Sequence, residues 1–95
     1  MFKKRRGIKL PYNKQGLIYF TCVNVKDMPD EVQEKIRTIC DEVGKEYSDV
    51  LYKVVTDSTR SIRSLAIEYH TSEMNLYRYR KKFYEMWEEM SRRGE

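Results

Sequence analysis

The chain has 95 residues, of which 40% are hydrophobic and 36% are charged, and its formal net charge is +4. This length allows one domain with a modest core, and the composition is that of a charged globular protein rather than a disordered chain. No apolar run reaches the roughly 20 residues of a membrane span, and the opening MFKKRRG has no apolar signal-peptide core, so we expect a cytoplasmic protein without a membrane partner.

The charges are unevenly distributed along the chain. Residues 3–14 contain six bases and no acid, residues 27–49 contain eight acids and three bases, and four of the five residues 78–82 are cationic. Two basic ends around an acidic middle are typical of a protein that binds a polyanion. We predict a basic flexible arm over residues 1–12, in which Lys3, Lys4, Arg5 and Arg6 contact phosphates, and a single helical domain over residues 13–95.

The segment KQGLIYFTCVNV favours a strand by composition, because it is rich in β-branched and aromatic residues. Its alternation is poor, however, and no other segment resembles a strand that would pair with it. A lone strand would leave its backbone groups without partners unless a second chain supplied them. We therefore expect a helix from about Asn13 to Val25, with a strand shared across a homodimer as the alternative.

Two further helices are expected before the C-terminal third. MPDEVQEKIRTICDEVG begins with proline and acids and ends with glycine, the polarity of a helix. Its apolar residues recur at intervals of three and four, namely Val32, Ile36, Ile39, Cys40 and Val43. The next segment, EYSDVLYKVV, repeats this spacing, and TDSTRS is a loop of residues that bond their own backbone.

The C-terminal third predicts two helices separated by a short turn. Ser61 is the expected N-cap of the first, and Ser72 that of the second, which runs to about Met90. Ala66 is the small residue at which the two would cross, so we predict a helix-turn-helix over residues 61–83. The buried stripe of the second helix is Leu76, Tyr79, Phe83, Met86, Trp87 and Met90, the last three of which would alternatively form a homodimer seam. The expected fold is a small all-α bundle of four to five helices ending in this helix-turn-helix.

The outward positions of the second helix are those expected to face DNA. They are Glu73, Met74, Tyr77, Arg78, Lys81 and Tyr84. Arg78 can donate two hydrogen bonds to guanine or bind phosphate, and the Tyr77 ring can contact a thymine methyl. The predicted contacts to double-stranded DNA are Ser72, Met74, Asn75, Tyr77, Arg78, Lys81 and Lys82, joined by the arm residues Lys3 to Arg6.

The sequence SIRSLAIEYHTSEMNLYRYRKKF resembles the helix-turn-helix of region four of bacterial sigma factors, and of small phage late-gene regulators of the RinA and ArpU type. The matching residues are Ser61, Leu65, Ala66, Glu68, Ser72, Leu76 and Arg78. The resemblance implies a sequence-specific transcriptional regulator of a phage or prophage. The chain departs from the pattern at Tyr69, where leucine is usual, and at His70, where glycine is usual, and Glu73 would repel phosphate.

Two other functions remain open at this point. A small phage protein could use its acidic segment 27–49 to bind a host nucleoprotein such as RNA polymerase or a CRISPR nuclease, or it could be a DNA-packaging accessory protein. An enzyme is not expected, because the chain has one histidine, no glycine-rich phosphate loop and no CxxC pair around Cys22 or Cys40. We likewise expect no cofactor and no metal site, and two reduced thiols in the core.

Overall fold

The computed structural model describes residues 7–93, and within this range its regular structure is entirely helical. The α-helices are α1 (Tyr12–Val23), α2 (Asp30–Gly44), α3 (Ser48–Thr56), α4 (Ile62–Glu68) and α5 (Glu73–Arg92), with 3-10 turns at Val25–Asp27 and Lys45–Tyr47. The all-α prediction is confirmed, and the segment with strand-like composition is the helix α1. Among the described residues, no helix combines the length and apolarity needed to cross a bilayer.

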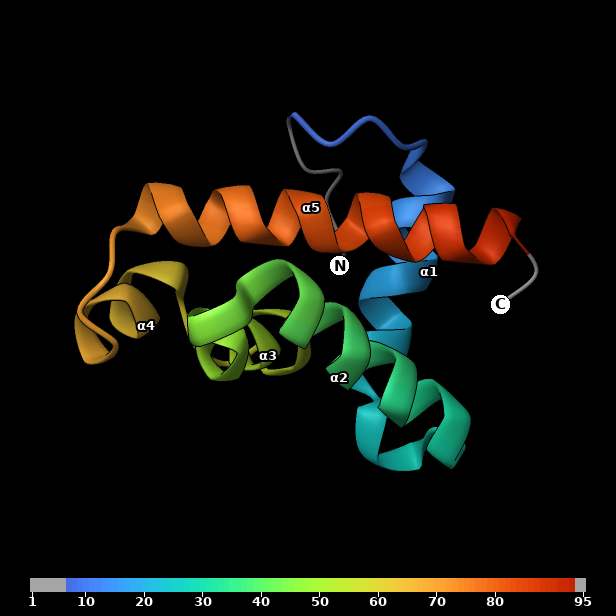
Figure 1. The fold of residues 1–95 in the computed structure, drawn as a ribbon, viewed down its shortest axis with the longest axis horizontal. Helices are drawn as coiled ribbons and strands as arrows, with labels where there is room; N and C mark the ends of the chain where they lie inside the picture. The colour runs from blue at the N-terminus through green and yellow to red at the C-terminus, as the bar shows by residue number, and fades with distance from the viewer. Residues whose placement is uncertain (1–6, 94–95) are drawn as a thin grey trace.

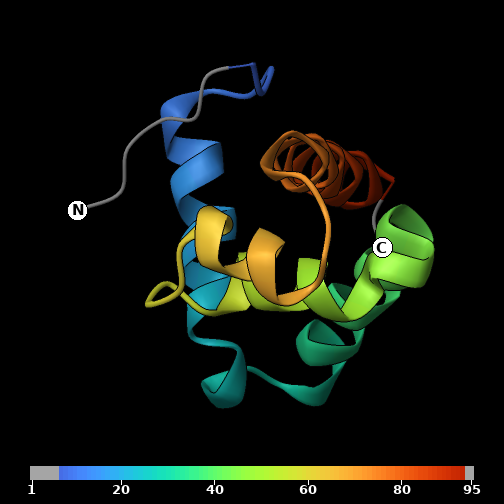
Figure 2. The same ribbon diagram turned by 90° about the vertical axis from the view of Figure 1, so that its left-hand side faces the viewer.

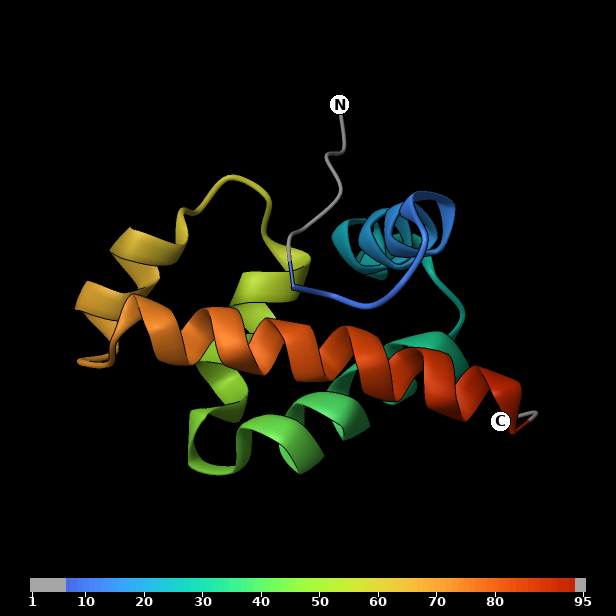
Figure 3. The ribbon, with the colours of Figure 1, turned by 90° about the horizontal axis from the view of Figure 1, so that it is seen from above.

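The longest helix, α5, runs along the long axis of the molecule, and the other helices are arranged around it (Figure 1). α1 crosses the C-terminal half of α5, whereas α4 lies beside its N-terminal end. Seen from above, α1 and the C-terminal end of α2 lie on opposite sides of α5 (Figure 3). The N-terminal turns of α5 therefore lie at one end of the molecule, away from α1.

Two groups of buried side chains hold these helices together. The large core joins α1, α2, α3 and the second half of α5, and consists of Ile8, Ile18, Cys22, Val25, Ile36, Ile39, Cys40, Leu51, Val55, Phe83 and Tyr84. The small core joins α3, α4 and the first half of α5 through Val50, Leu65, Ala66 and Leu76. Because α3 and α5 contribute to both cores, they fix the position of α4 relative to the rest of the domain.

The ends of α2 follow the sequence signals closely. The helix starts after Pro29, and Asp30 and Glu31 lie in its first turn, where negative charge is favourable. Gly44 is its last residue, as predicted, but its own φ is −85° and the left-handed residue is Lys45, with φ 51°. A Cβ at Gly44 would lie 3.4 Å from Cδ2 of Leu51, so this glycine lets α3 pack closely against the end of α2.

The packed domain begins before α1, within the range predicted as a flexible arm. Ile8 is only 6% exposed and belongs to the large core. The buried amide of Gln15 donates to the carbonyl oxygens of Ile8 at 3.3 Å and Leu10 at 2.9 Å, which ties this segment to α1. Residues 8–12 are therefore part of the folded unit, and Lys3, Lys4, Arg5 and Arg6 lie outside the described residues.

Candidate nucleic-acid interface

The two C-terminal helices start at the serines that the sequence indicates. The hydroxyl of Ser61 accepts a hydrogen bond from the backbone N–H of Ser64 at 3.0 Å, and that of Ser72 accepts one from Asn75 at 3.1 Å. Each bond satisfies one of the N–H groups that a helix start leaves without a partner inside the helix. The chain thus ends α4, turns, and begins α5 with a new cap.

The turn between α4 and α5 is closed by backbone hydrogen bonds around a left-handed residue. The N–H of Thr71 donates to the carbonyl of Ala66 at 3.0 Å, and that of His70 donates to Ile67 at 3.3 Å. These two bonds form a Schellman motif, in which the residue with positive φ is usually glycine. Here that residue is His70, with φ 54°. The departure from glycine noted in the sequence therefore changes the residue type but leaves the turn geometry intact.

The crossing of α4 over α5 is packed as the sequence predicts. Viewed along α5, α4 lies crosswise to it (Figure 2). Ala66 is 4% exposed and shares the small core with Leu76 of α5 and Val50 of α3, while Leu65 is fully buried. A small side chain at this position lets the two helices approach closely, and α3 completes a three-helix unit.

The outward face of the first half of α5 carries most of the predicted contact residues. Met74 is 69% exposed and Tyr77 is 49% exposed, and Ser72, Arg78 and Lys82 are also exposed. Met74, Tyr77, Arg78 and Lys81 are spaced by three and four residues and so share one side of the helix. Glu73 is exposed in the first turn of the same helix.

Three residues that were predicted to face outward or to contact DNA are placed differently. Asn75 is half-buried, and its side-chain amide donates to the hydroxyl of Thr71 at 3.3 Å. Lys81 is half-buried rather than fully exposed. The prediction for Tyr84 is wrong, because this side chain is only 3% exposed and belongs to the large core. The reason is that α1 covers this side of α5 in its second half but not in its first.

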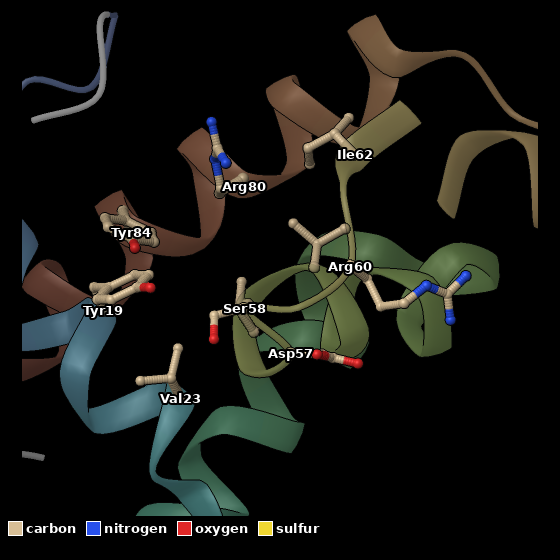
Figure 4. Close-up of a pocket in the computed structure, with 10 residues that line it drawn as sticks. Tyr19, Val23, Asp57, Ser58, Arg60, Ile62, Arg80 and Tyr84 are labelled. Atoms are coloured by element: carbon tan, nitrogen blue, oxygen red, sulfur yellow. The ribbon is translucent and has the colours of Figure 1, made fainter. Parts of the chain in front are cut away.

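Figure 4 shows how Tyr84 is covered. It lies at a small pocket formed by α1, by α5 and by the loop that follows α3. Tyr84 points toward Tyr19 of α1, and both line the pocket, whose volume is about 110 Å³. This is well below the roughly 300–1,000 Å³ of ordinary small-molecule sites. The guanidinium of Arg60 points away from the pocket, where it donates to Glu68.

Two arginines of this region were not among the predicted site residues. Arg80 is half-buried, and its guanidinium lies 5.1 Å from the centroid of the Tyr77 ring, within the range of a cation–π interaction. Arg63 is exposed in the first turn of α4. The first helix of a helix-turn-helix crosses the DNA backbone, so the place of Arg63 in this helix could have predicted a phosphate contact from the sequence.

Charged pairs attach the end of α4 to α3 and to the loop before it. Glu68 accepts from Arg60 and lies 3.7 Å from the ammonium of Lys53, which is itself 5.1 Å from the centroid of the Tyr69 ring. The hydrogen bond from Arg60 lowers the pKa of the Glu68 carboxyl and raises the pKa of Arg60. Since Glu68 is exposed and its partners are only half-buried, we assign these pairs an orienting role rather than a large contribution to stability.

The cysteines are placed as inert core residues. Cys22 and Cys40 are both buried, and burial is the main cause that raises the pKa of Cys40 to about 12 and that of Cys22 further. Such thiols stay protonated and unreactive at neutral pH. Within residues 7–93, no three His, Cys, Asp or Glu side chains form a group suited to a metal ion.

Comparison with known proteins yields no match for this chain, whether with protein-family models, with curated proteins or with solved structures. A function must therefore be inferred from the residues and geometry of the molecule itself. The feature with the most chemical content is the exposed side of α5 that follows the turn at His70.

Proposed function

We propose that the protein binds double-stranded DNA in a sequence-specific manner, with the N-terminal half of α5 in the major groove. The observation that carries this proposal is the side of α5 formed by Met74, Tyr77 and Arg78, which is exposed directly after a capped helix start. The major groove is wide enough for an α-helix. The position of these turns at one end of the molecule supports an approach to a duplex without obstruction by α1 (Figure 1).

Several side chains of this region have the chemistry to contact bases or phosphates. The planar guanidinium of Arg78 can donate to O6 and N7 of guanine, and Tyr77 can place its ring against a thymine methyl. Glu73 can accept from the amino group of cytosine. Lys82 and Arg63 are exposed cations and Lys81 is a half-buried one, so all three are candidates for phosphate contacts, which fix the register of a helix on the duplex.

The biological context within this proposal is transcription control in a phage or prophage. Its support is the similarity of residues 61–83 to the helix-turn-helix of sigma factor region four, at the positions that also form the caps and the small core. The three-helix unit of α3, α4 and α5 is consistent with such a module. Fold alone does not specify function, so DNA binding requires a direct measurement.

The test is selection of binding sites from random duplex DNA, followed by fluorescence anisotropy on the selected duplex. If about five phosphates are neutralised, the logarithm of affinity should fall with the logarithm of salt concentration with a slope of about −4 to −5. Arg78→Ala should weaken binding to the selected site by about 1–3 kcal/mol, roughly 5- to 150-fold, and should relax the preference at one base pair.

Lys26→Ala is the matched control, because Lys26 is an exposed cation in the turn between α1 and α2 and carries the same charge. It should change affinity by less than about twofold, since its side chain lies away from the proposed interface. An affinity independent of salt, or equal losses for both variants, would contradict the proposal. Selection of no preferred sequence would leave only a packaging-type, non-specific DNA contact.

A second candidate is a protein-interaction module, and one observation favours it. Ile67 and Met74 are each 69% exposed at the α4–α5 end of the molecule, and such apolar side chains also suit a protein partner. A pull-down with purified bacterial RNA polymerase, beside a gel shift on random duplex DNA, separates the two. Under the second candidate, Ile67→Glu and neutralisation of the acids of residues 27–49 should each weaken polymerase capture. Under the first, neutralising these acids should leave DNA binding intact.

A further inference from the structure

The outer face of α1 is unusually apolar for an exposed surface. Leu17 is 68% exposed, Phe20 is 53% exposed and Tyr12 is 52% exposed. Six large hydrophobic side chains are exposed among the described residues, and these three of them lie on this one helix. Leu17 and Phe20 are three residues apart and therefore adjacent on the helix surface. Asn13 and Asn24, exposed and uncharged, lie on the same side.

This face is also nearly free of charge, although 36% of the chain is charged. The only ionisable group of α1 that is charged at neutral pH is Lys14, and its ammonium is paired with the carboxylate of Glu88 on α5. Charged residues are depleted at the centres of protein interfaces and remain at their rims. The arrangement on α1 has this form, with an apolar centre at Leu17 and Phe20 and an ion pair at the edge.

A shallow groove of about 300 Å³ lies directly beside Leu17, between α1 and the last turns of α5. Its apolar floor includes Ile18, which is 2% exposed, and the ring of Trp87. The indole is fixed from two sides, because its centroid is 6.0 Å from that of Phe83 and 4.2 Å from the ammonium of Lys35. A protruding pair of apolar side chains thus stands next to a preformed apolar recess.

We infer that this face binds a second copy of the same chain, with the two α1 helices packed against each other about a twofold axis. Such an interface uses the same patch on both subunits, so the patch must carry both a protrusion and a recess that fit each other. Here the protrusion is formed by Leu17 and Phe20, and the recess is the groove beside Trp87. Leu17 and Phe20 of one copy pack into the partner's groove beside Trp87, and the partner's equivalent residues pack in return.

Charge favours a second copy over a strongly charged partner. Each copy carries a net charge of +4, so two copies can associate only through a surface that does not bring like charges together. At the rim of the groove Lys14 is already paired with Glu88 within the chain, so Arg92 is the one further charged side chain among the residues that line it. A highly acidic or basic partner would find no matching charge at the centre of this face.

The interface is small and leaves the proposed DNA-binding surface free. Burial centred on three large side chains per copy stays below the roughly 1,200 Å² of a standard stable interface, so the dimer should be weak, with a dissociation constant on the order of 10–100 µM. α1 crosses the C-terminal half of α5 (Figure 1), whereas Met74, Tyr77 and Arg78 lie in the first turns of this helix. Dimerisation through α1 is therefore independent of whether α5 binds DNA.

Sedimentation velocity between about 5 and 500 µM tests the inference. The mean mass should rise from 11.6 kDa towards twice that value across this range. Leu17→Glu and Phe20→Glu should each weaken association at least tenfold, because they place like charges at the centre of the interface. Both residues are exposed, so the far-UV circular dichroism and melting temperature of the variants should match those of the wild type.

Ile67→Glu is the matched control, because Ile67 is as exposed as Leu17 but lies on α4. It should leave the concentration-dependent mass unchanged. As a second readout, Leu17→Cys should give a covalent dimer with a short bis-maleimide linker, while Ile67→Cys should not. A wild-type chain that stays monomeric at 500 µM would overturn the inference and assign the face to a different partner, and equal loss in the Ile67→Glu control would overturn it as well.

Discussion

The left-handed turn at His70 can be tested by comparing glycine with alanine at two positions, His70 and Lys82. We expect the order of stability of the two variants to be opposite at these positions. With φ at 54°, any residue with a Cβ is strained here, by roughly 1–2 kcal/mol relative to glycine. Glycine in turn loses more backbone entropy on folding than alanine, which costs about 0.5–1 kcal/mol. The difference leaves His70→Gly more stable than His70→Ala by about 0.5–1 kcal/mol.

In the middle of α5 the order reverses, because both helix propensity and backbone entropy favour alanine. Lys82 is exposed there, so Lys82→Gly should be less stable than Lys82→Ala by about 0.5–1 kcal/mol. For a domain of 95 residues, 1 kcal/mol corresponds to about 4–8 °C in melting temperature. His70→Gly should therefore melt about 2–8 °C above His70→Ala, and Lys82→Gly a similar amount below Lys82→Ala.

Thermal unfolding followed by circular dichroism, with urea titrations of the same four variants, measures both differences. Comparing glycine with alanine at each position removes the effect of losing the original side chain. If His70→Gly were equal to or less stable than His70→Ala while the Lys82 pair behaved as expected, the turn would not be left-handed and the geometry between α4 and α5 would be wrong.

Three further predictions concern the cores and the charged pairs. Leu76→Ala should lower the free energy of unfolding by about 2–5 kcal/mol in urea titrations, because it empties the centre of the small core, and a loss below 1 kcal/mol would contradict this packing. Glu68 has a lowered pKa in the folded state, so its contribution is present above its ordinary pKa near 4.5 and is lost as the pH falls through the folded value. Glu68→Gln should accordingly show a smaller loss of stability between pH 7 and pH 3 than the wild type. Cys22 and Cys40 should react with a thiol reagent at neutral pH only when the protein is unfolded, and rapid labelling of the native chain would show that the large core opens.

The sequence predicts the helices well where local and long-range signals agree. The caps at Ser61 and Ser72, the end of α2 at Gly44 and the burial of Leu76 and Phe83 in α5 all follow from residue types at short spacing. The other residues of the predicted stripe, Tyr79, Met86, Trp87 and Met90, are half-buried. α1 is the instructive case, because its composition favours a strand. The correct prediction came from the absence of a pairing partner elsewhere in the chain, which outweighs local propensity.

The error at Tyr84 concerns a contact between segments that are distant in sequence. Tyr84 lies on the same side of α5 as Tyr77, two turns further on, and periodicity alone places both outward. α1 covers only the second half of the helix, so one tyrosine is buried and the other is exposed. The error at Ile8 has a different cause: this residue joins the large core from a segment with no helical pattern, which the amide of the nearby Gln15 ties to α1.

α5 is one unbroken helix of 20 residues, about 30 Å long, and its two halves are anchored in different cores. The helix is consequently rigid, and its exposed N-terminal turns cannot rotate independently of the rest of the domain. A macromolecule that binds residues 74–78 therefore fixes the orientation of the whole domain, including the direction in which α1 points.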